Sequence, residues 1–140
     1  MFLQIIKQLN TAILPKKAHS TDIGFDIHCI SLKKKLGNET YLYDTGLKIK
    51  PPKGYYVEII PRSSISKSGF ILANNTGIID PDYTGNLYVA LTKIDKTKPN
   101  LTLPFKLVQL VIRKQYSFPL KIVDKFKETK RGDGGFGSTN

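Results

Sequence analysis

Hydrophobic and polar positions recur along the chain in short runs that are separated by turn residues. Four such runs are "YLYDTGLKIK" (41–50), "GYYVEII" (54–60), "GNLYVALTKI" (85–94) and "LPFKLVQLVI" (103–112). They are rich in Val, Ile, Tyr and Leu, which favour strands, and Gly, Pro, Asn and Asp lie between them. The pattern therefore predicts β-strands over these four segments.

Helical periodicity is weak along the whole chain. No window carries a sustained helical stripe with a capping signal, although "SSISKSG" (63–69) allows one turn of helix. The segments "LKKKLGNE" (32–39) and "DKTKPN" (95–100) predict exposed hairpin loops. With no internal repeat and no linker, we expect a single all-β domain, built as a sandwich or a barrel.

The C-terminal segment has a different composition. From residue 121 the chain turns basic and polar, which predicts a solvated tether, and it closes with "RGDGGFGSTN" (131–140). Glycine loses more conformational entropy on ordering than any other residue. We therefore expect a tail that is mobile until a bound ligand compensates for its ordering, with simple disorder as the alternative.

Composition limits the location and the partner. The start of the chain, "MFLQIIKQLN", has no signal-peptide pattern, and no run approaches the ~20 apolar residues of a membrane span. The single cysteine, Cys29, cannot form an internal disulfide, which suits a reducing compartment inside the cell. A net charge of +11 favours a phosphate-rich partner, either a nucleic acid or a nucleotide, although lysines on a solvated surface also explain it.

Familiar catalytic arrangements are missing from the sequence. The two histidines, His19 and His28, give no zinc spacing and little scope for a Ser-His-Asp or Cys-His arrangement. There is no GxxxxGK[ST] loop and no GxGxxG after a strand. An enzyme of this sequence would use carboxylates and basic residues, with any metal held mainly by its substrate.

Two internal loops carry candidate chemistry. In "IIPRSSISKSG" (59–69), Arg62 offers a planar donor fork, and Ser63 and Ser64 can line a phosphate. The alternative there is an ordinary polar turn after a strand. In "NNTGIIDPDYTGN" (74–86), we expect Ile78 and Ile79 to be buried, with Asp80 at the rim of the core as a general base. The alternative for Asp80 is an Asx-turn before Pro81.

Five motifs in order resemble the homotrimeric dUTP diphosphatases (dUTPases) over nearly the whole chain. "STDIGFDI" (20–27) is similar to the first motif, G-Y-D-L, and "PRSSISKSG" (61–69) to the second, P-R-S-G. "GIIDPDYTGN" (77–86) resembles the third, G-[VI]-I-D-x-D-Y-x-G, and "FKLVQLVI" (105–112) the fourth, R-[IFL]-A-Q-L. "RGDGGFGSTN" (131–140) nearly repeats the closing motif. The resemblance implies a distorted β-barrel of the jelly-roll type over residues 1–120, with 121–140 as tether and lid.

The resemblance also implies a reaction, in which dUTP is hydrolysed to dUMP and pyrophosphate by water attack at the α-phosphorus. This activity keeps uracil out of DNA and supplies dUMP for dTMP synthesis. Asp80 would activate the water, and the ring of Tyr83 would lie under the deoxyribose and leave no room for a 2′-hydroxyl. Mg²⁺ would bind chiefly to the three phosphates, with Asp26 acting at most through water.

By the same resemblance, substrate binding is shared among three groups of residues. The uracil would be read by Asn74, Gly77, Ile78, Ile79 and Tyr88, partly through main-chain groups. The phosphates would be held by Arg62, Ser63, Ser64 and Gln109. The tail would close with Phe136 stacked over uracil and with Arg131, Gly137, Ser138 and Thr139 on the phosphates. The family forms trimers with sites at the subunit junctions, so we expect a homotrimer and neither stable nucleic-acid binding nor a membrane partner.

Five positions depart from the family pattern. Ser64 replaces the glycine of P-R-S-G, and Thr84 stands where many members carry Arg or Gln. In the fourth motif Lys106 replaces the arginine and Val108 the alanine, and Asn140 replaces the final glycine of the closing motif. A lysine cannot copy the bidentate fork of an arginine, so contacts there are expected to be looser.

Two alternatives remain open from the sequence. The dCTP deaminases share the fold and carry an R-S-S loop with I-D-P, but their catalytic glutamate would fall at Ala90. A nucleic-acid-binding β-barrel would use exposed aromatics such as Tyr41, Tyr43, Tyr55 and Tyr56 on basic strands, and would leave the loop motifs without a role.

Overall fold

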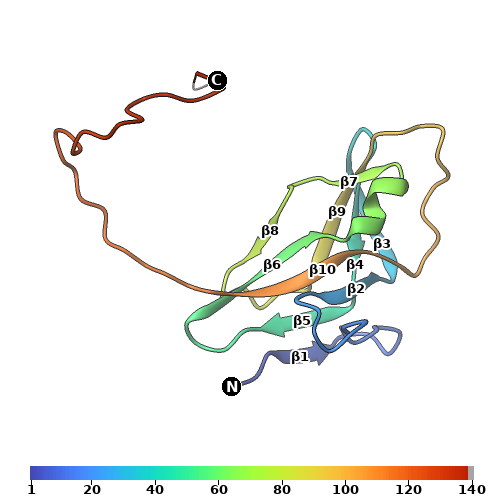
Figure 1. Cartoon of the computed structure of the whole chain (residues 1–140). Helices are drawn as coiled ribbons and strands as arrows, with labels where there is room; N and C mark the ends of the chain where they lie inside the picture. Colours follow the sequence, from blue (N-terminus) through green and yellow to red (C-terminus); the bar gives the residue numbers. More distant parts are fainter. Residues whose placement is uncertain (139–140) are drawn as a thin grey trace.

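The computed structural model describes residues 1–138, which form ten strands and one short 3₁₀ helix (Figure 1). The strands are β1 (Gln4–Lys7), β2 (Phe25–Cys29), β3 (Ser31–Gly37), β4 (Thr40–Asp44), β5 (Leu47–Lys50), β6 (Tyr55–Pro61), β7 (Phe70–Leu72), β8 (Gly77–Ile79), β9 (Tyr88–Lys93) and β10 (Phe105–Lys114). The helix η1 covers Ser63–Lys67, where the sequence allowed one turn. The all-β prediction is confirmed.

Three antiparallel sheets make up the body of the molecule. Within the described residues, their strand orders are β1-β5, β2-β10-β6-β8 and β3-β4-β9-β7. Buried side chains of both four-stranded sheets form one core cluster, with Ile27, Val108 and Leu110 from one sheet and Val89 and Leu91 from the other. This core fixes the faces of the strands, because a slip of one residue would turn every buried side chain outward.

Three local predictions need correction. The lysine run at 32–39 was expected to be a loop, but β3 extends through it, and the hairpin turns only at residues 38 and 39. An exposed edge strand tolerates consecutive lysines, whose charge also discourages edge-to-edge aggregation. The run at 41–50 is two strands in different sheets, because the chain turns at Thr45 and Gly46, where Gly46 has a φ of +67°. Residues 95–100 form a loop as expected, but the loop is not a hairpin, because it connects β9 and β10, which belong to different sheets.

After β10 the chain leaves the body. Gln115 still donates its backbone N–H to the Gly54 carbonyl at 2.8 Å. From there residues 115–138, here called the C-terminal arm, contain no strand and extend away from the sheets (Figure 1). The arm begins before residue 120, the predicted end of the barrel. Among residues 1–138, no helix is long and apolar enough to cross a membrane.

Candidate functional site

Asp80 stands at the mouth of an open pocket directly after β8. The pocket has a volume of about 170 Å³ and is lined by Ile78, Ile79, Asp80, Tyr83, Asn86 and Tyr88. The Asp80 side chain is exposed, and within residues 1–138 it forms no salt bridge. Its turn is closed by the main chain, where the Tyr83 N–H donates to the Asp80 carbonyl at 3.0 Å. The carboxylate is therefore accessible to a water molecule.

The expected burial of the two isoleucines before Asp80 is half wrong. Ile79 is partly buried and packs against the core, but the Ile78 side chain is 54% exposed. The reason is the period of two along a strand: β8 is an edge strand in which Gly77 and Ile79 turn inward and Ile78 turns outward. Ile78 therefore forms part of the pocket wall.

Tyr83 is held at its main chain and at its hydroxyl. Its backbone N–H donates to the Asp80 carbonyl, and its hydroxyl donates to the Asn86 carbonyl at 2.7 Å. Burial raises the pKa of the Tyr83 phenol above its ordinary value, and the charges of Tyr88 and Asp44 add to the shift. The phenol therefore remains a neutral donor, and its ring offers a fixed surface beside Asp80.

A second pocket adjoins the first. It has a volume of about 140 Å³ and shares Ile78, Ile79 and Tyr88 with the Asp80 pocket. Asn74, Gly77 and Ala90 also line it. The residues expected to read a base thus lie together on β8, on β9 and on the turn before β8.

A third pocket contains predicted phosphate ligands and lies at the β2 edge of the sheet β2-β10-β6-β8. Its volume is about 250 Å³, and Asp26, Arg62, Ser63 and Gln109 line it. Gln109 donates its Nε2 to the Pro61 carbonyl at 3.0 Å. The hydroxyl of Ser64 lies outside this lining and accepts from Arg62 Nη1 at 3.4 Å.

A carboxylate between two cations organises this third pocket. Arg62 Nε lies 2.7 Å from Asp26 Oδ1, and Lys106 Nζ lies 3.0 Å from Asp26 Oδ2. Arg62 also donates Nη1 to the Lys106 carbonyl at 3.1 Å. The β2–β10 register shifts between Phe105 and Val108, and this irregularity contains Lys106. A β-bulge re-aims side chains in this way, so Lys106 reaches the Asp26 carboxylate of the pocket although the sequence suggested only a looser substitute.

His28 is a neighbour of this pocket that sequence reasoning did not select. It lies on β2 two residues from Asp26, and the alternation of a strand places both on one face. Its Nδ1 is buried without a hydrogen-bond partner in residues 1–138. Burial lowers the pKa of His28, and Lys106 lowers it further, so the ring is neutral near the two cations. The alternation of β2 was the signal that could have found it.

The described residues do not form a protein cage for a metal ion. Among residues 1–138 there is no group of three His, Cys, Asp or Glu side chains that could hold one. Both oxygens of Asp26 already face cations, at 2.7 and 3.0 Å. A divalent cation here would need most of its oxygen ligands from elsewhere.

Within one chain the Asp80 pocket and the phosphate pocket lie apart. Val57 pairs with Ile79, so Asp80 follows β8 at the Tyr56 end of β6, whereas Arg62 follows the other end. Arg62 lies six residue steps along the extended strand from Tyr56, which is ~20 Å at the rise of a β-strand. A single triphosphate cannot bridge two such positions on one chain.

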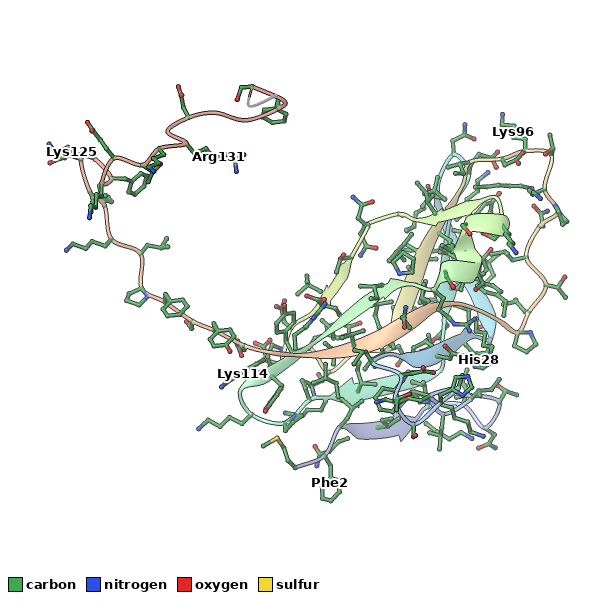
Figure 2. All side chains as sticks on the ribbon, in the orientation of Figure 1. Phe2, His28, Lys96, Lys114, Lys125 and Arg131 are labelled. Carbon is green, nitrogen blue, oxygen red and sulfur yellow. The ribbon has the colours of Figure 1, made fainter. Side chains whose placement is uncertain are left out.

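The predicted tail residues lie on the C-terminal arm, away from all three pockets. Arg131 is far from the body (Figure 2), and its Nε donates to the Gly134 carbonyl at 2.8 Å. Phe136 is fully exposed, and the Ser138 N–H donates to the Gly135 carbonyl at 3.1 Å. Gly137 has a φ of +85°. Thr139 lies outside the described residues.

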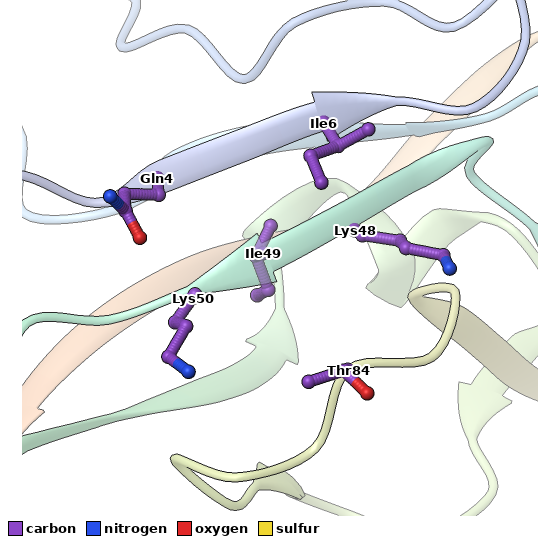
Figure 3. A pocket seen from close by; sticks show the side chains of 6 residues that line it. All are labelled: Gln4, Ile6, Lys48, Ile49, Lys50 and Thr84. Atoms are coloured by element: carbon purple, nitrogen blue, oxygen red, sulfur yellow. The ribbon is translucent and has the colours of Figure 1, made fainter.

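A further surface pocket lies beside the two-stranded sheet (Figure 3). It has a volume of about 130 Å³ and lies between β1, β5 and Thr84, with Ile6 and Ile49 among its lining residues. No predicted catalytic or binding residue lines it.

Comparison with known proteins identifies relatives over the whole chain. The dUTPase family model matches residues 10–140. The deoxyuridine 5′-triphosphate nucleotidohydrolase of Picosynechococcus sp. is 34% identical over 140 residues, 99% of each chain, and that of Escherichia phage T5 is 32% identical over 142 residues, 96% of each chain. The structure of the dUTPase of Staphylococcus bacteriophage 80alpha with dUpNHpp is similar with a TM-score of 0.79 at 26% identity, over 99% of this chain and 98% of that chain.

Proposed function

This chain belongs to the dUTPase family and is a dUTP diphosphatase, and we propose that Asp80 is the general base of its reaction. The observation that carries the proposal is the exposed carboxylate of Asp80, which forms no salt bridge within residues 1–138 and lines a pocket that also presents a fixed tyrosine ring. A carboxylate placed in this way can take a proton from water, which typically accelerates a reaction ~10²–10⁴-fold.

The reaction divides into one bond formed and one bond broken. The water oxygen attacks the α-phosphorus and Asp80 accepts the proton. The bond between the α-phosphorus and the oxygen that bridges to the β-phosphate then breaks, and the electron pair leaves with pyrophosphate. dUMP remains. Cationic and amide donors lower the barrier because they meet the charge that develops on the phosphate oxygens.

The two adjoining pockets provide the specificity. Asn74, Gly77 and Tyr88 line the part that would hold uracil. We propose that the methyl group of thymine would be rejected there. The Tyr83 ring would lie against the deoxyribose and exclude a 2′-hydroxyl by contact. Ile78 and Ile79 form the wall that the two pockets share.

The phosphates would be bound by the pocket at the β2 edge. Arg62, Ser63 and Gln109 line it, and Ser64 lies beside Arg62. Lys106 adds a second cation, at 3.0 Å from Asp26. We propose that Lys106 contributes a point charge where an arginine would provide a fork.

Mg²⁺ would enter with the substrate. dUTPases generally use Mg²⁺, and a phage phi11 dUTPase of the same fold, at 24% identity and a TM-score of 0.75, has a structural Mg(II) ion. In this chain both Asp26 oxygens are paired with cations, so the phosphates would supply most of the ligands and Asp26 would act through water. The ion would neutralise charge on the triphosphate when bound.

We propose that complete sites form between copies of the chain, in a homotrimer. The support is geometric: the Asp80 pocket and the phosphate pocket lie at opposite ends of β6, and the C-terminal arm extends away from both. In a trimer, Asp80 of one copy would meet Arg62 and Gln109 of another. The arm, with residues 121–140 as tether and lid, would then bring Phe136 and Arg131 to a neighbouring site.

Subunit mixing tests this arrangement. An Asp80→Asn chain and a chain truncated after Lys130 should each have little activity. If each site takes these parts from different copies, mixed trimers reassembled from the two chains regain part of the wild-type rate. A mixture that stays as inactive as its components, although its mass shows a mixed trimer, would contradict shared sites.

The dCTP deaminase alternative is disfavoured by the wall of the base pocket. Ala90 lines this pocket on β9, at the position where the deaminases would carry their catalytic glutamate. A methyl group cannot shuttle protons for deamination.

A nucleic-acid-binding barrel is disfavoured by the position of the tyrosines. Tyr43 is buried in the core, where its ring packs edge-on against Phe105 at 4.9 Å. The Tyr56 hydroxyl donates to Glu58 at 2.7 Å, which places a carboxylate beside the ring. We therefore propose that the substrate is a nucleotide.

We also propose that the enzyme acts inside the cell, which suits its single cysteine, Cys29. Burial raises the pKa of Cys29 to about 12, which keeps its thiol unreactive.

One assay separates the three activities. The protein is mixed with Mg²⁺ and dUTP, dCTP or a short oligonucleotide, and the products are separated. Formation of dUMP and pyrophosphate from dUTP is the expected result. Ammonia released from dCTP would indicate the deaminase, and salt-sensitive oligonucleotide binding without turnover would indicate the binding module.

A further inference from the structure

The loop that carries Tyr83 is tied to a buried turn in a distant part of the sequence. This turn, here called the DTG turn, comprises Asp44, the last residue of β4, and Thr45 and Gly46, which lead to β5. Asp44 and Thr45 are the two polar residues buried in the body of residues 1–138, at 9% and 0% exposure. Buried polar groups are costly unless they are hydrogen-bonded, so their partners matter.

Three hydrogen bonds of Leu87 join the end of the Tyr83 loop to the DTG turn and to Leu47, the first residue of β5. The Leu87 N–H donates to the Leu47 carbonyl at 2.7 Å. The Leu87 carbonyl accepts from the Thr45 N–H at 3.2 Å and from the Thr45 hydroxyl at 2.7 Å. Leu87 is itself fully buried, so this connection is part of the core.

One side chain connects the DTG turn to the ring. Asn86 Nδ2 lies 3.3 Å from Asp44 Oδ2 and 3.5 Å from Asp44 Oδ1, while Asp44 Oδ1 also accepts from the Gly46 N–H at 2.7 Å. The carbonyl of the same Asn86 accepts the Tyr83 hydroxyl at 2.7 Å. Asn86 thus joins a buried carboxylate to the phenol through two hydrogen bonds in series.

Gly85 provides the space that this arrangement requires. A Cβ at Gly85 would meet the Tyr83 Oη at 2.5 Å and its Cζ at 2.6 Å. The ring therefore lies directly over the main chain of its own loop, which allows its hydroxyl to reach the Asn86 carbonyl.

We propose that Asp44, acting through Asn86, is a positioning residue that fixes the Tyr83 ring and so determines how strongly the enzyme rejects a ribonucleotide. This inference rests on the proposed role of Tyr83 in the function above. A hydrogen bond from a neutral donor to a buried carboxylate is stronger than one between neutral groups, because the interior screens it poorly. Steric rejection of a 2′-hydroxyl depends on a ring that cannot move aside, so discrimination falls when the anchor of the ring is loosened.

The ratio of kcat/KM for dUTP to kcat/KM for UTP measures this role. Asp44→Asn leaves an amide facing the amide of Asn86, and Asn86→Asp leaves two facing carboxylates. We expect each change to lower the ratio roughly tenfold, the usual effect of losing a charge-assisted hydrogen bond. The double variant Asp44→Asn/Asn86→Asp restores a carboxylate–amide pair and should return the ratio toward wild type. A double variant no more selective than either single variant would overturn the pairing.

A matched control separates positioning from general stability. The Thr40 and Thr92 hydroxyls are 2.9 Å apart on β4 and β9. They lie at the opposite end of this strand pair from Asp44, which pairs with Tyr88. Thr92→Val should lower the midpoint of thermal unfolding without changing the selectivity ratio. If Thr92→Val lowers the ratio as much as Asp44→Asn, loss of stability explains both and the inference is overturned.

Two tyrosine variants distinguish this inference from the proposed function. Tyr83→Ala removes the ring, and an unchanged ratio in that variant would remove Tyr83 from substrate selection altogether. Tyr83→Phe keeps the ring but deletes the hydroxyl that Asn86 holds, and it should lower the ratio like Asp44→Asn even if the Asp44 variants fold poorly. If Tyr83→Ala loses selectivity while Tyr83→Phe retains the wild-type ratio, the ring acts without this anchor.

Discussion

Gly24 is expected to support catalysis through the space it leaves for Gln109. It lines the phosphate pocket, and a Cβ built there would overlap Gln109 Oε1 and lie 2.8 Å from its Cδ and 3.1 Å from its Cβ. The neighbours of Gln109 on β10, Val108 and Leu110, are fully buried, so this strand cannot shift. In Gly24→Ala the amide of Gln109 must therefore swing out of the pocket.

The cost follows from what the amide loses. Its bond from Nε2 to the Pro61 carbonyl, at 3.0 Å, breaks, and such a bond contributes ~0.5–1.5 kcal/mol. A forced off-rotamer side chain adds ~0.5–1.5 kcal/mol. The free energy of unfolding should then fall by about 1–3 kcal/mol. We expect kcat/KM for dUTP to fall roughly tenfold, because Gln109 is a proposed phosphate ligand.

The assay combines denaturant unfolding with steady-state kinetics on four proteins: wild type, Gly24→Ala, Gln109→Ala and the double variant. In the Gln109→Ala background the two shortest contacts of the added methyl group are gone, and its contact with the Cβ at 3.1 Å remains. Gly24→Ala should there be within about 0.5 kcal/mol of neutral, since its backbone does not require a positive φ. The kcat/KM of the double variant should equal that of Gln109→Ala.

Additive effects would refute the reasoning. If Gly24→Ala costs as much in the Gln109→Ala background as in the wild type, the methyl group acts on something other than the amide. A Gly24→Ala enzyme with wild-type kcat/KM would show that Gln109 does not need its present position.

Three further outcomes are expected. Asp80→Asn should fold and bind dUTP, measured by calorimetry, while pyrophosphate release falls ~10²–10⁴-fold; equal turnover would remove Asp80 from the mechanism. Truncation after Lys130 should leave the unfolding midpoint unchanged and weaken catalysis severely, whereas an unchanged rate would make the end of the arm dispensable. Hydrogen bonds from the Tyr56 hydroxyl and then from Arg113 hold the pKa of Glu58 below its ordinary value of 4.5. The Glu58 carboxylate therefore stabilises the fold fully above pH 4.5, and this contribution is lost as the pH falls through the lowered pKa. Glu58→Gln should therefore flatten the acid side of a stability–pH curve, and a curve that keeps its wild-type slope would contradict this assignment.

Much of the fold and of the site follows from local sequence. The runs at 54–60, 85–94 and 103–112 became β6, β9 and β10, because β-branched and aromatic residues bounded by Gly, Pro and Asn favour strands whatever their partners. The loops after β6 and β8 likewise carry Arg62 and Asp80 to pockets, since a polar residue directly after a buried strand emerges at its end. Motifs of this kind are local and can be read from the chain itself.

Strand pairing could not be predicted from local sequence, because it depends on residues far apart in the chain. The lysines of β3 became a strand only through pairing with β4, and the exposure of Ile78 follows from the edge position of β8. The ion pairs of Asp26 with Arg62 and Lys106 join three separate strands or their ends.

The sequence by itself determined the strand-forming segments, the family motifs and the residue types available for catalysis, because these depend on neighbours along the chain. The tertiary structure decided where those residues meet: it placed Asp80 and Arg62 at opposite ends of β6, and it brought Asp44 to Asn86 across 42 positions. The physical reason is that the register of a sheet is set by burying one face of every strand at once, a condition that no single segment contains.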